Sequence, residues 1–163
     1  MANAKLNAEP GWYTGDSLVN LGIAGGWANA LVRKSVSFDG GVGSGQVGTV
    51  ALFTVTGAVA FYITAICTET LVGAATIEVG TAGSTAGIIA QVADATALLT
   101  GEIWYDATPT TVLDTIANGR LGYIIGDGAD IILTVGAANV TDGTIVFQVW
   151  YTPLTVGATV VAA

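Results

Sequence analysis

The sequence predicts an all-β protein: a β-sandwich or jelly-roll-like antiparallel domain with an extended N-terminal arm. Residues 49–80 are rich in Thr, Val, Ile, Phe and Tyr, the residue types that favour strands. Turn signals built on Gly, Asn-Gly and Asp-Gly recur roughly every dozen residues, as in sandwiches of short strands. No long stretch shows the 3.6-residue period of an amphipathic helix.

The strand around residues 59–68 is the clearest element. Alternation would place one set of side chains on one face: Val59, Phe61, Ile63, Ala65 and Cys67. The intervening set would lie on the other: Ala60, Tyr62, Thr64, Ile66 and Thr68. Because both sets are fairly apolar, we expect the strand to be covered on both sides. Residues 47–67 are uncharged and reach the ~20 residues of a membrane span. Their β-branched composition and the lack of flanking Lys or Arg favour a strand, so no membrane partner is expected.

The remaining elements are expected in the following chain order. A first strand at residues 30–38 precedes a glycine-rich connector at 39–48, and a hairpin turns at Gly57. Residues 94–100 are expected to form a loop, with a single helical turn as the alternative. Asn118-Gly119 is a turn signal, and Pro153 ends the last regular strand. Further strands are expected at residues 74–79, 88–92, 111–116, 121–125, 130–135 and 144–151. The uncharged tail at residues 156–163 should pair as an edge strand or pack on a neighbour.

Two regions follow from this order: an arm and connector at residues 1–45, and a sandwich domain at residues 46–163. Within residues 1–29, large side chains occur at no steady period. Trp12, Tyr13 and Trp27 are therefore predicted to be anchors, which dock either on this domain or on a neighbouring molecule.

The composition limits the kinds of partner that the protein can bind. Its 163 residues suffice for one domain, and charged residues make up 10% against about 25% in ordinary soluble domains. Such a chain either covers its surface with small polar residues or hides much of it against other subunits. The net charge is -8, with Lys5, Arg33, Lys34 and Arg120 as the four bases. A chain this acidic cannot neutralise a run of phosphates, so no nucleic-acid partner is expected.

Residues suited to catalysis or metal binding are few. The chain has no His, and its one cysteine, Cys67, falls in an apolar strand where a thiol behaves as a small hydrophobe. Glu69 with Glu78, or Glu102 with Asp106, are candidate acid–base pairs for glycoside hydrolysis, but their spacing resembles that of scattered surface acids. Asp127 and Asp130 resemble part of a calcium loop that lacks its later ligands. We expect no enzymatic activity, no metal and no cofactor.

Two aromatic pairs, Trp104-Tyr105 and Trp150-Tyr151, allow two interpretations. They can stack on sugars, or they can pack in a core or an interface. Packing is the commoner role of such pairs.

A family resemblance appears in four segments of the chain. These are FTVTGAVAFYITAICTETLVGAATIEVGTAGSTAGIIAQ, GEIWYDATPTT, GADIILTVGAANVTDGTIVFQVWYTPL and the closing TVVAA. Together they resemble a group of small virion proteins of tailed bacteriophages, regarded as capsid decoration or cement proteins. The resemblance covers about residues 47–163 and rests on the order of strands and turns. The first 45 residues match nothing in the group, which leaves the mode of attachment open.

The resemblance implies a β-domain on the outer surface of the capsid, binding the major capsid protein and stabilising capsomer contacts. It also implies a homo-oligomer, with a trimer favoured. We expect capsid contacts at Trp12, Tyr13, Trp27, Arg33 and Lys34, and self-association at Val160 and Val161 in the C-terminal strand. The alternative is a fibre or surface module that binds carbohydrate.

Overall fold

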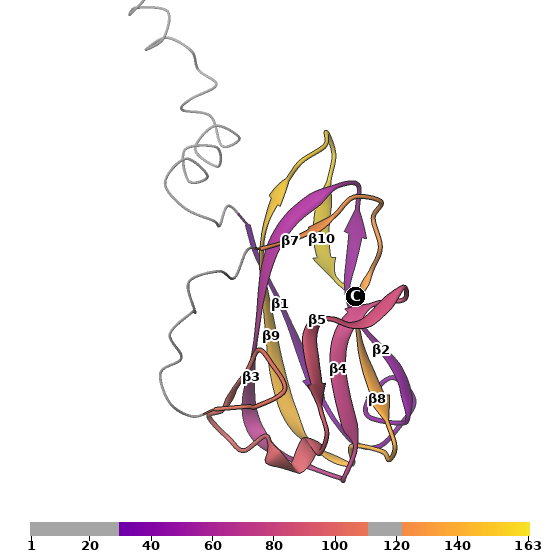
Figure 1. The fold of residues 1–163 in the computed structure, drawn as a ribbon, viewed down its shortest axis with the longest axis vertical. Helices are drawn as coiled ribbons and strands as arrows, with labels where there is room; N and C mark the ends of the chain where they lie inside the picture. The colour runs from indigo at the N-terminus through magenta and orange to yellow at the C-terminus, as the bar shows by residue number, and fades with distance from the viewer. Residues whose placement is uncertain (1–29, 111–121) are drawn as a thin grey trace, which may run out of the picture.

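The computed structural model describes residues 30–110 and 122–163. Nearly all of this part of the chain is β-structure, in two antiparallel sheets that form separate layers (Figure 1). The strands are β1 (Ala30–Ser37), β2 (Gly48–Thr56), β3 (Val59–Val72), β4 (Thr76–Thr81), β5 (Ser84–Val92), β6 (Ile103–Trp104), β7 (Tyr123–Ile125), β8 (Ile131–Gly136), β9 (Asp142–Pro153) and β10 (Thr159–Ala162). A short 3-10 turn, η2 (Ala95–Ala97), lies between β5 and β6.

Strand order identifies the architecture as a jelly roll. Sheet I has the order β1-β9-β3-β6, with β7 also paired to β3, and sheet II has the order β10-β2-β8-β4-β5. The pairs are nested: β1 with β9, β2 with β8, β3 with β6 and β7, and β4 with β5. A long hairpin wrapped into two layers gives this nesting, which defines the double-sheet jelly roll. The predicted all-β sandwich is therefore confirmed.

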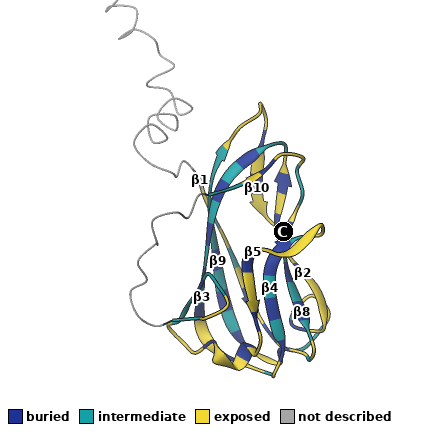
Figure 2. Ribbon diagram, in the orientation of Figure 1, coloured by how far each residue is buried: buried dark blue, intermediate teal, exposed yellow. Residues whose placement is uncertain are grey.

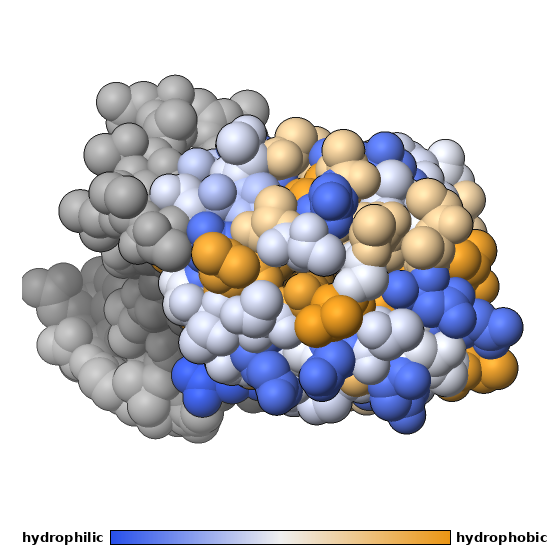
Figure 3. Space-filling view, turned by 90° about the horizontal axis from the view of Figure 1, so that it is seen from below, coloured by the Kyte–Doolittle hydropathy of each residue, from blue (hydrophilic) through white to orange (hydrophobic). Residues whose placement is uncertain are grey.

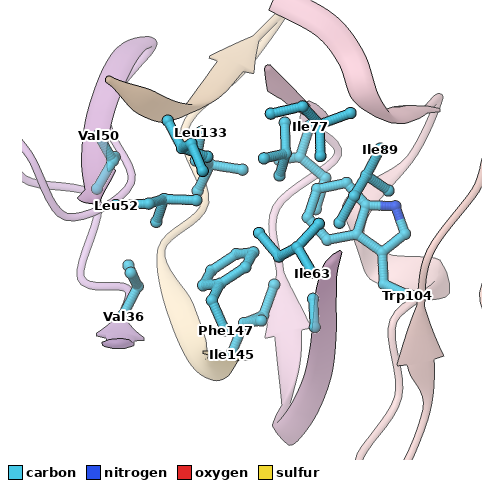
Figure 4. Close-up of a cluster of buried hydrophobic side chains, with 14 of the residues drawn as sticks. Val36, Val50, Leu52, Ile63, Ile77, Ile89, Trp104, Leu133, Ile145 and Phe147 are labelled. Atoms are coloured by element: carbon cyan, nitrogen blue, oxygen red, sulfur yellow. The ribbon is translucent and has the colours of Figure 1, made fainter. Parts of the chain in front are cut away.

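The core fills the space between the sheets with the inward side chains of both. On β3, Val59, Phe61, Ile63, Ala65 and Cys67 are all buried, as alternation predicts. Figure 2 shows buried residues along the central strands and exposed residues mainly at turns. In Figure 4, side chains from sheet I, such as Phe147, meet side chains from sheet II, such as Leu133. Each large side chain buried here contributes roughly 1.5–3 kcal/mol.

The outer face of β3 differs from the expectation that both faces are covered. Ala60, Tyr62, Thr64 and Ile66 are only partly buried, and no described strand packs over them. The apolar character of this face therefore does not reflect a second internal layer within the described residues.

The boundary between arm and domain also needs correction. β1 pairs with β9 from Ala30 opposite Tyr151 to Ser37 opposite Thr144, so this strand is part of sheet I and the predicted start of the domain at residue 46 is wrong. A strand that supplies a sheet edge and buries Val36 belongs to the domain it completes.

The predicted connector at residues 39–48 is a closed turn rather than a hinge. Asp39 accepts hydrogen bonds from the Ser44 hydroxyl and, at 2.8 Å, from the Gly41 N–H. Both hydrogen bonds lower the pKa of Asp39, and the bond from the Ser44 hydroxyl has the larger effect. Gly45 has φ +119°, and a Cβ there would lie 2.1 Å from the Val140 carbonyl oxygen, so the β8–β9 loop packs directly on this turn.

Other expected elements are found close to their predicted places. The tail forms edge strand β10 against β2, as predicted. Within residues 94–100 the chain makes the single turn η2, capped by Asp94, which accepts from the Thr96 N–H at 3.0 Å. The strand expected at 111–116 and the turn at Asn118-Gly119 lie outside the described residues. None of the helical structure in the described ranges has the length and hydropathy to span a membrane.

Candidate interaction surface

Of the predicted capsid contacts, the structure describes Arg33 and Lys34, which point to opposite faces of β1. Trp12, Tyr13 and Trp27 lie outside the described residues. Arg33 is exposed on the outer face of sheet I, opposite Gln148 of β9. Lys34 points the other way, and its ammonium group donates to the carbonyl oxygen of Ala163 where the edges of the two sheets meet. Arg33 and Lys34 therefore project from opposite faces of β1.

The predicted self-association residues also separate. Val160 is 2% exposed and belongs to the core, whereas Val161 is 52% exposed on the outer face of sheet II. The Val160 side chain is enclosed by its own domain and cannot contact another subunit, so the predicted self-association would use Val161 and the outer edge of β10. Val161 remains accessible.

The two sequence-adjacent aromatic pairs, Trp104-Tyr105 and Trp150-Tyr151, are also divided between the core and the surface. Trp104 is fully buried and packs edge-on against Phe147, with ring centroids 6.2 Å apart, so it cannot be a stacking platform. Tyr151 packs partly against the core. Trp150 points outward and lies beside Tyr62 of β3, with centroids 5.8 Å apart and planes tilted by 38°. The exposed aromatic pair is therefore formed across strands, not between neighbours in sequence.

Three cross-strand rows build the surface around this pair. The first joins Leu31, Trp150 and Tyr62, the second Arg33, Gln148 and Thr64, and the third Ser35, Val146, Ile66 and Ile103. Residues directly opposite in antiparallel strands share a face, so the register alone assembles these rows. We call this surface the aromatic face: Leu31, Arg33, Ser35, Tyr62, Thr64, Ile66, Ile103, Val146, Gln148 and Trp150.

The aromatic face is apolar in its first and third rows and polar in its second. Leu31 is 43% exposed, and Ile124, which lies opposite Ala60 beyond the first row, is 71% exposed. The whole outer face of sheet I measures about 27 Å along the strands and about 14 Å across them, an area on the order of 400 Å². This area is in the range of the largest patch on a typical monomer, about 300–600 Å², which is often functional, so we take the aromatic face as the candidate interaction surface.

The outer face of sheet II is built from small residues. Thr49, Thr134 and Glu78 form one row, and Ala51 and Ile132 lie in the next. Glu78 accepts a hydrogen bond from the Gln91 amide at 2.8 Å. Thr49 is exposed to solvent, whereas the Thr134 hydroxyl is enclosed and has no hydrogen-bond partner among the described residues, so this face is polar but not hydrated throughout.

The acids that were candidates for catalysis have local structural partners. Glu69 accepts from the Thr144 hydroxyl at 2.9 Å, and Glu102 from the Leu99 N–H at 2.8 Å. Asp106 accepts from the Thr108 N–H at 2.7 Å. These bonds hold turns and strand ends in place.

The acids of the GDGAD segment also have structural partners. Asp127 accepts from the Ala129 N–H, and Asp130 accepts from the Val55 N–H at 3.1 Å, where it binds the backbone of β2. In the described ranges, no group of three or more His, Cys, Asp or Glu side chains is placed to hold a metal ion.

Cys67 is enclosed in the core. Its thiol donates to the Glu69 carbonyl oxygen at 3.1 Å, and burial raises its pKa. A protonated thiol in this position acts as a small apolar side chain.

The remaining surface is less continuous. Figure 3 views the end where the β3–β4 turn lies, and there hydrophobic surface is broken up by hydrophilic side chains. A shallow hollow of about 330 Å³ lies at the edge between β1 and β2, lined by Ser35, Val50, Ala51 and Ala163 among others. Neither region combines large apolar side chains across several strands as the aromatic face does.

Comparisons with protein families, with curated proteins and with solved structures found no match for this chain. Its function is therefore inferred from its own residues.

Proposed function

We propose that the protein is a virion structural protein, a decoration or cement protein that binds the outside of a tailed-bacteriophage head and stabilises contacts between capsomers. The aromatic face is the observation that supports this proposal. It places Trp150, Tyr62 and Leu31 at the surface of a jelly roll whose core is already complete. Large aromatic side chains of this kind dominate the energy of protein–protein contacts.

The size of the face suits a protein that works in many copies. A stable pairwise interface buries about 800 Å² per partner, roughly twice what the outer face of sheet I offers. One copy bound by this face alone would bind weakly. Residues 1–29 adjoin β1 at the edge of the face and would supply further contact area, and a homo-oligomer, proposed as a trimer, would engage several capsomers at once. Summed over a lattice, such contacts stabilise the shell.

Co-sedimentation with heads of the encoding phage, purified without the protein, tests the proposal. Matched substitutions identify the face: Ile66→Lys on the outer face of sheet I and Ile132→Lys on that of sheet II. Both side chains are half-buried and outward on central strands. We expect wild type and Ile132→Lys to bind at a fixed stoichiometry, and Ile66→Lys to bind roughly tenfold or more weakly.

Two results would contradict the proposal. Failure of the wild-type protein to co-sediment with heads would reject the decoration role. Equal loss of binding in both variants, with unchanged melting temperatures, would reject the assignment to the aromatic face.

A second candidate function is a carbohydrate-binding module, and the Tyr62–Trp150 pair favours it. Two partly exposed rings side by side on a flat sheet resemble the platforms on which sugar rings stack, and Gln148 and Thr64 lie on the next row to bind hydroxyls. A glycan array distinguishes the two functions. Specific saturable binding that Trp150→Ala abolishes would favour the carbohydrate-binding module. An array that shows no specific binding would favour the decoration role.

A further inference from the structure

We propose that the partner of the aromatic face presents a protein carboxylate, an Asp or Glu side chain within an otherwise apolar surface, to the guanidinium of Arg33. This inference rests on the proposed function and specifies the chemistry of the surface that the face binds.

Arg33 lies in the middle row of the aromatic face, on its edge strand β1. Its neighbours on the same row are Gln148 and Thr64, and the rows on either side begin with Leu31 and Ser35 of the same strand. Trp150 and Tyr62 lie on one flanking row and Val146, Ile66 and Ile103 on the other. A flat partner that extends over Leu31 and Trp150 on one side and over Val146 on the other also reaches the guanidinium.

Covering Arg33 removes its water, and a guanidinium cannot lose its charge to compensate. Among the described residues it forms no ion pair or hydrogen bond that would replace that water, because its row offers only the neutral side chains of Gln148 and Thr64. A partner without a complementary anion would therefore leave a partly desolvated, unpaired charge within the interface. A carboxylate satisfies the planar guanidinium with two parallel hydrogen bonds.

The charges on the rest of the molecule make this pairing selective. Arg33 and Lys34 are the bases within the described ranges, and the Lys34 ammonium group is engaged by the Ala163 carbonyl oxygen. The chain as a whole carries -8. The acidic chain repels an acidic partner elsewhere and attracts it at Arg33. The ion pair between Arg33 and the carboxylate would therefore fix the position in which the partner docks.

Aliphatic residues favour a protein partner over an acidic sugar. Leu31, Val146, Ile66 and Ile103 surround the polar row, and a polyhydroxylated ligand would leave most of this apolar surface uncovered. An acidic polysaccharide would still provide a carboxylate, so it is included in the test as a competing ligand.

The test measures head binding by co-sedimentation over a range of salt concentrations. The variants are Arg33→Gln, Arg33→Glu and Lys34→Gln as the matched control on the adjacent, inward-pointing residue. We expect Arg33→Gln to weaken binding roughly ten- to a hundredfold, as loss of a charged hydrogen-bonded pair does. Arg33→Glu should bind more weakly still, and both should lose part of the salt dependence. Lys34→Gln should bind as wild type, and melting temperatures should confirm folding.

The outcomes separate this inference from the proposed function. Wild-type protein that binds heads, with Arg33→Gln and Arg33→Glu binding equally well and with the same salt dependence, overturns the inference and leaves the decoration role intact. Wild-type protein that does not bind heads overturns both. Competition by hyaluronate oligosaccharides, without competition by the matching neutral oligosaccharides, would assign the carboxylate to a sugar and overturn the protein partner.

Discussion

The two outer faces of the sandwich differ although both are built from strands of the same jelly roll. Sheet I presents Leu31, Trp150, Tyr62 and Ile66 on three strands, whereas sheet II presents mainly threonine and alanine, with Ile132 and Val161. Both faces pair their side chains in regular cross-strand rows. The difference therefore lies in the size of the side chains and not in the backbone.

This difference supports the proposal that sheet I is the face that contacts other molecules. Threonine suits a strand exposed to water, because its β-branched side chain favours extended backbone and its hydroxyl stays hydrated. Large aromatic and aliphatic side chains gain free energy only when they leave water. Sheet II is therefore equipped for solvent, and sheet I for a partner.

The largest expected effect is a loss of stability on substitution of Phe147, an inward-pointing residue of β9. Phe147 is fully buried against Trp104. Phe147→Ala should lower the free energy of unfolding by about 3–5 kcal/mol, since it removes a core ring and leaves a cavity. Urea denaturation measures this loss. A change below about 1 kcal/mol would mean that the side chain is not part of a packed core.

Trp150, three residues further along β9, should behave differently. Trp150→Ala should weaken binding to heads by ~2 kcal/mol, roughly thirtyfold, as loss of a central aromatic contact does, with a smaller change in stability than Phe147→Ala. Titration of heads with labelled protein measures it. The control is Thr54→Ala, a truncation on the exposed face of sheet II, and equal effects of the two substitutions would erase the functional contrast between the faces.

The C-terminal strand offers the same contrast within two adjacent residues. Val160→Ala should cost ~1.5 kcal/mol, because it removes two methyl groups from the core. Val161→Ala should change stability by less than about 0.5 kcal/mol. Thermal unfolding of the two variants compares them directly. The reverse ranking would mean that β10 pairs with β2 one residue out of register.

The smallest effect concerns turns that belong to neither face. The pKa of Asp39 is lowered by the Ser44 hydroxyl and then the Gly41 N–H, and that of Asp94 by the hydroxyl and N–H of Thr96. A lowered folded pKa stabilises the protein above the ordinary value of 3.8, and this contribution is lost as pH falls through the folded pKa. The unfolding free energy of Asp39→Asn should therefore fall less than that of wild type between pH 5 and pH 3, measured by urea denaturation. Identical acid dependence would contradict the role of Asp39.

Sequence patterns predicted which side chains of β3 share a face, the edge strand β10 and the all-β class, because each depends on local alternation and composition. They predicted a strand at residues 30–38, which matches β1, but assigned it to the arm, because its place in sheet I depends on pairing with β9. They left Trp104 with Tyr105 open between a sugar platform and packing, and the position of Trp104 in the core agrees with packing. Alternation shows which residues share a face, but it does not show which of the two faces is covered.

What the sequence determined by itself is the class of structure and the small number of groups suited to catalysis. Strand-forming residues, frequent turn signals and the lack of histidine are properties of composition and short-range order. Only the tertiary structure decided that Tyr62 lies beside Trp150, that Arg33 lies between two apolar rows, and that Val160 is inside while Val161 is outside. These relations follow from the nested pairing of strands far apart in the chain, and local sequence does not specify the register of such pairs.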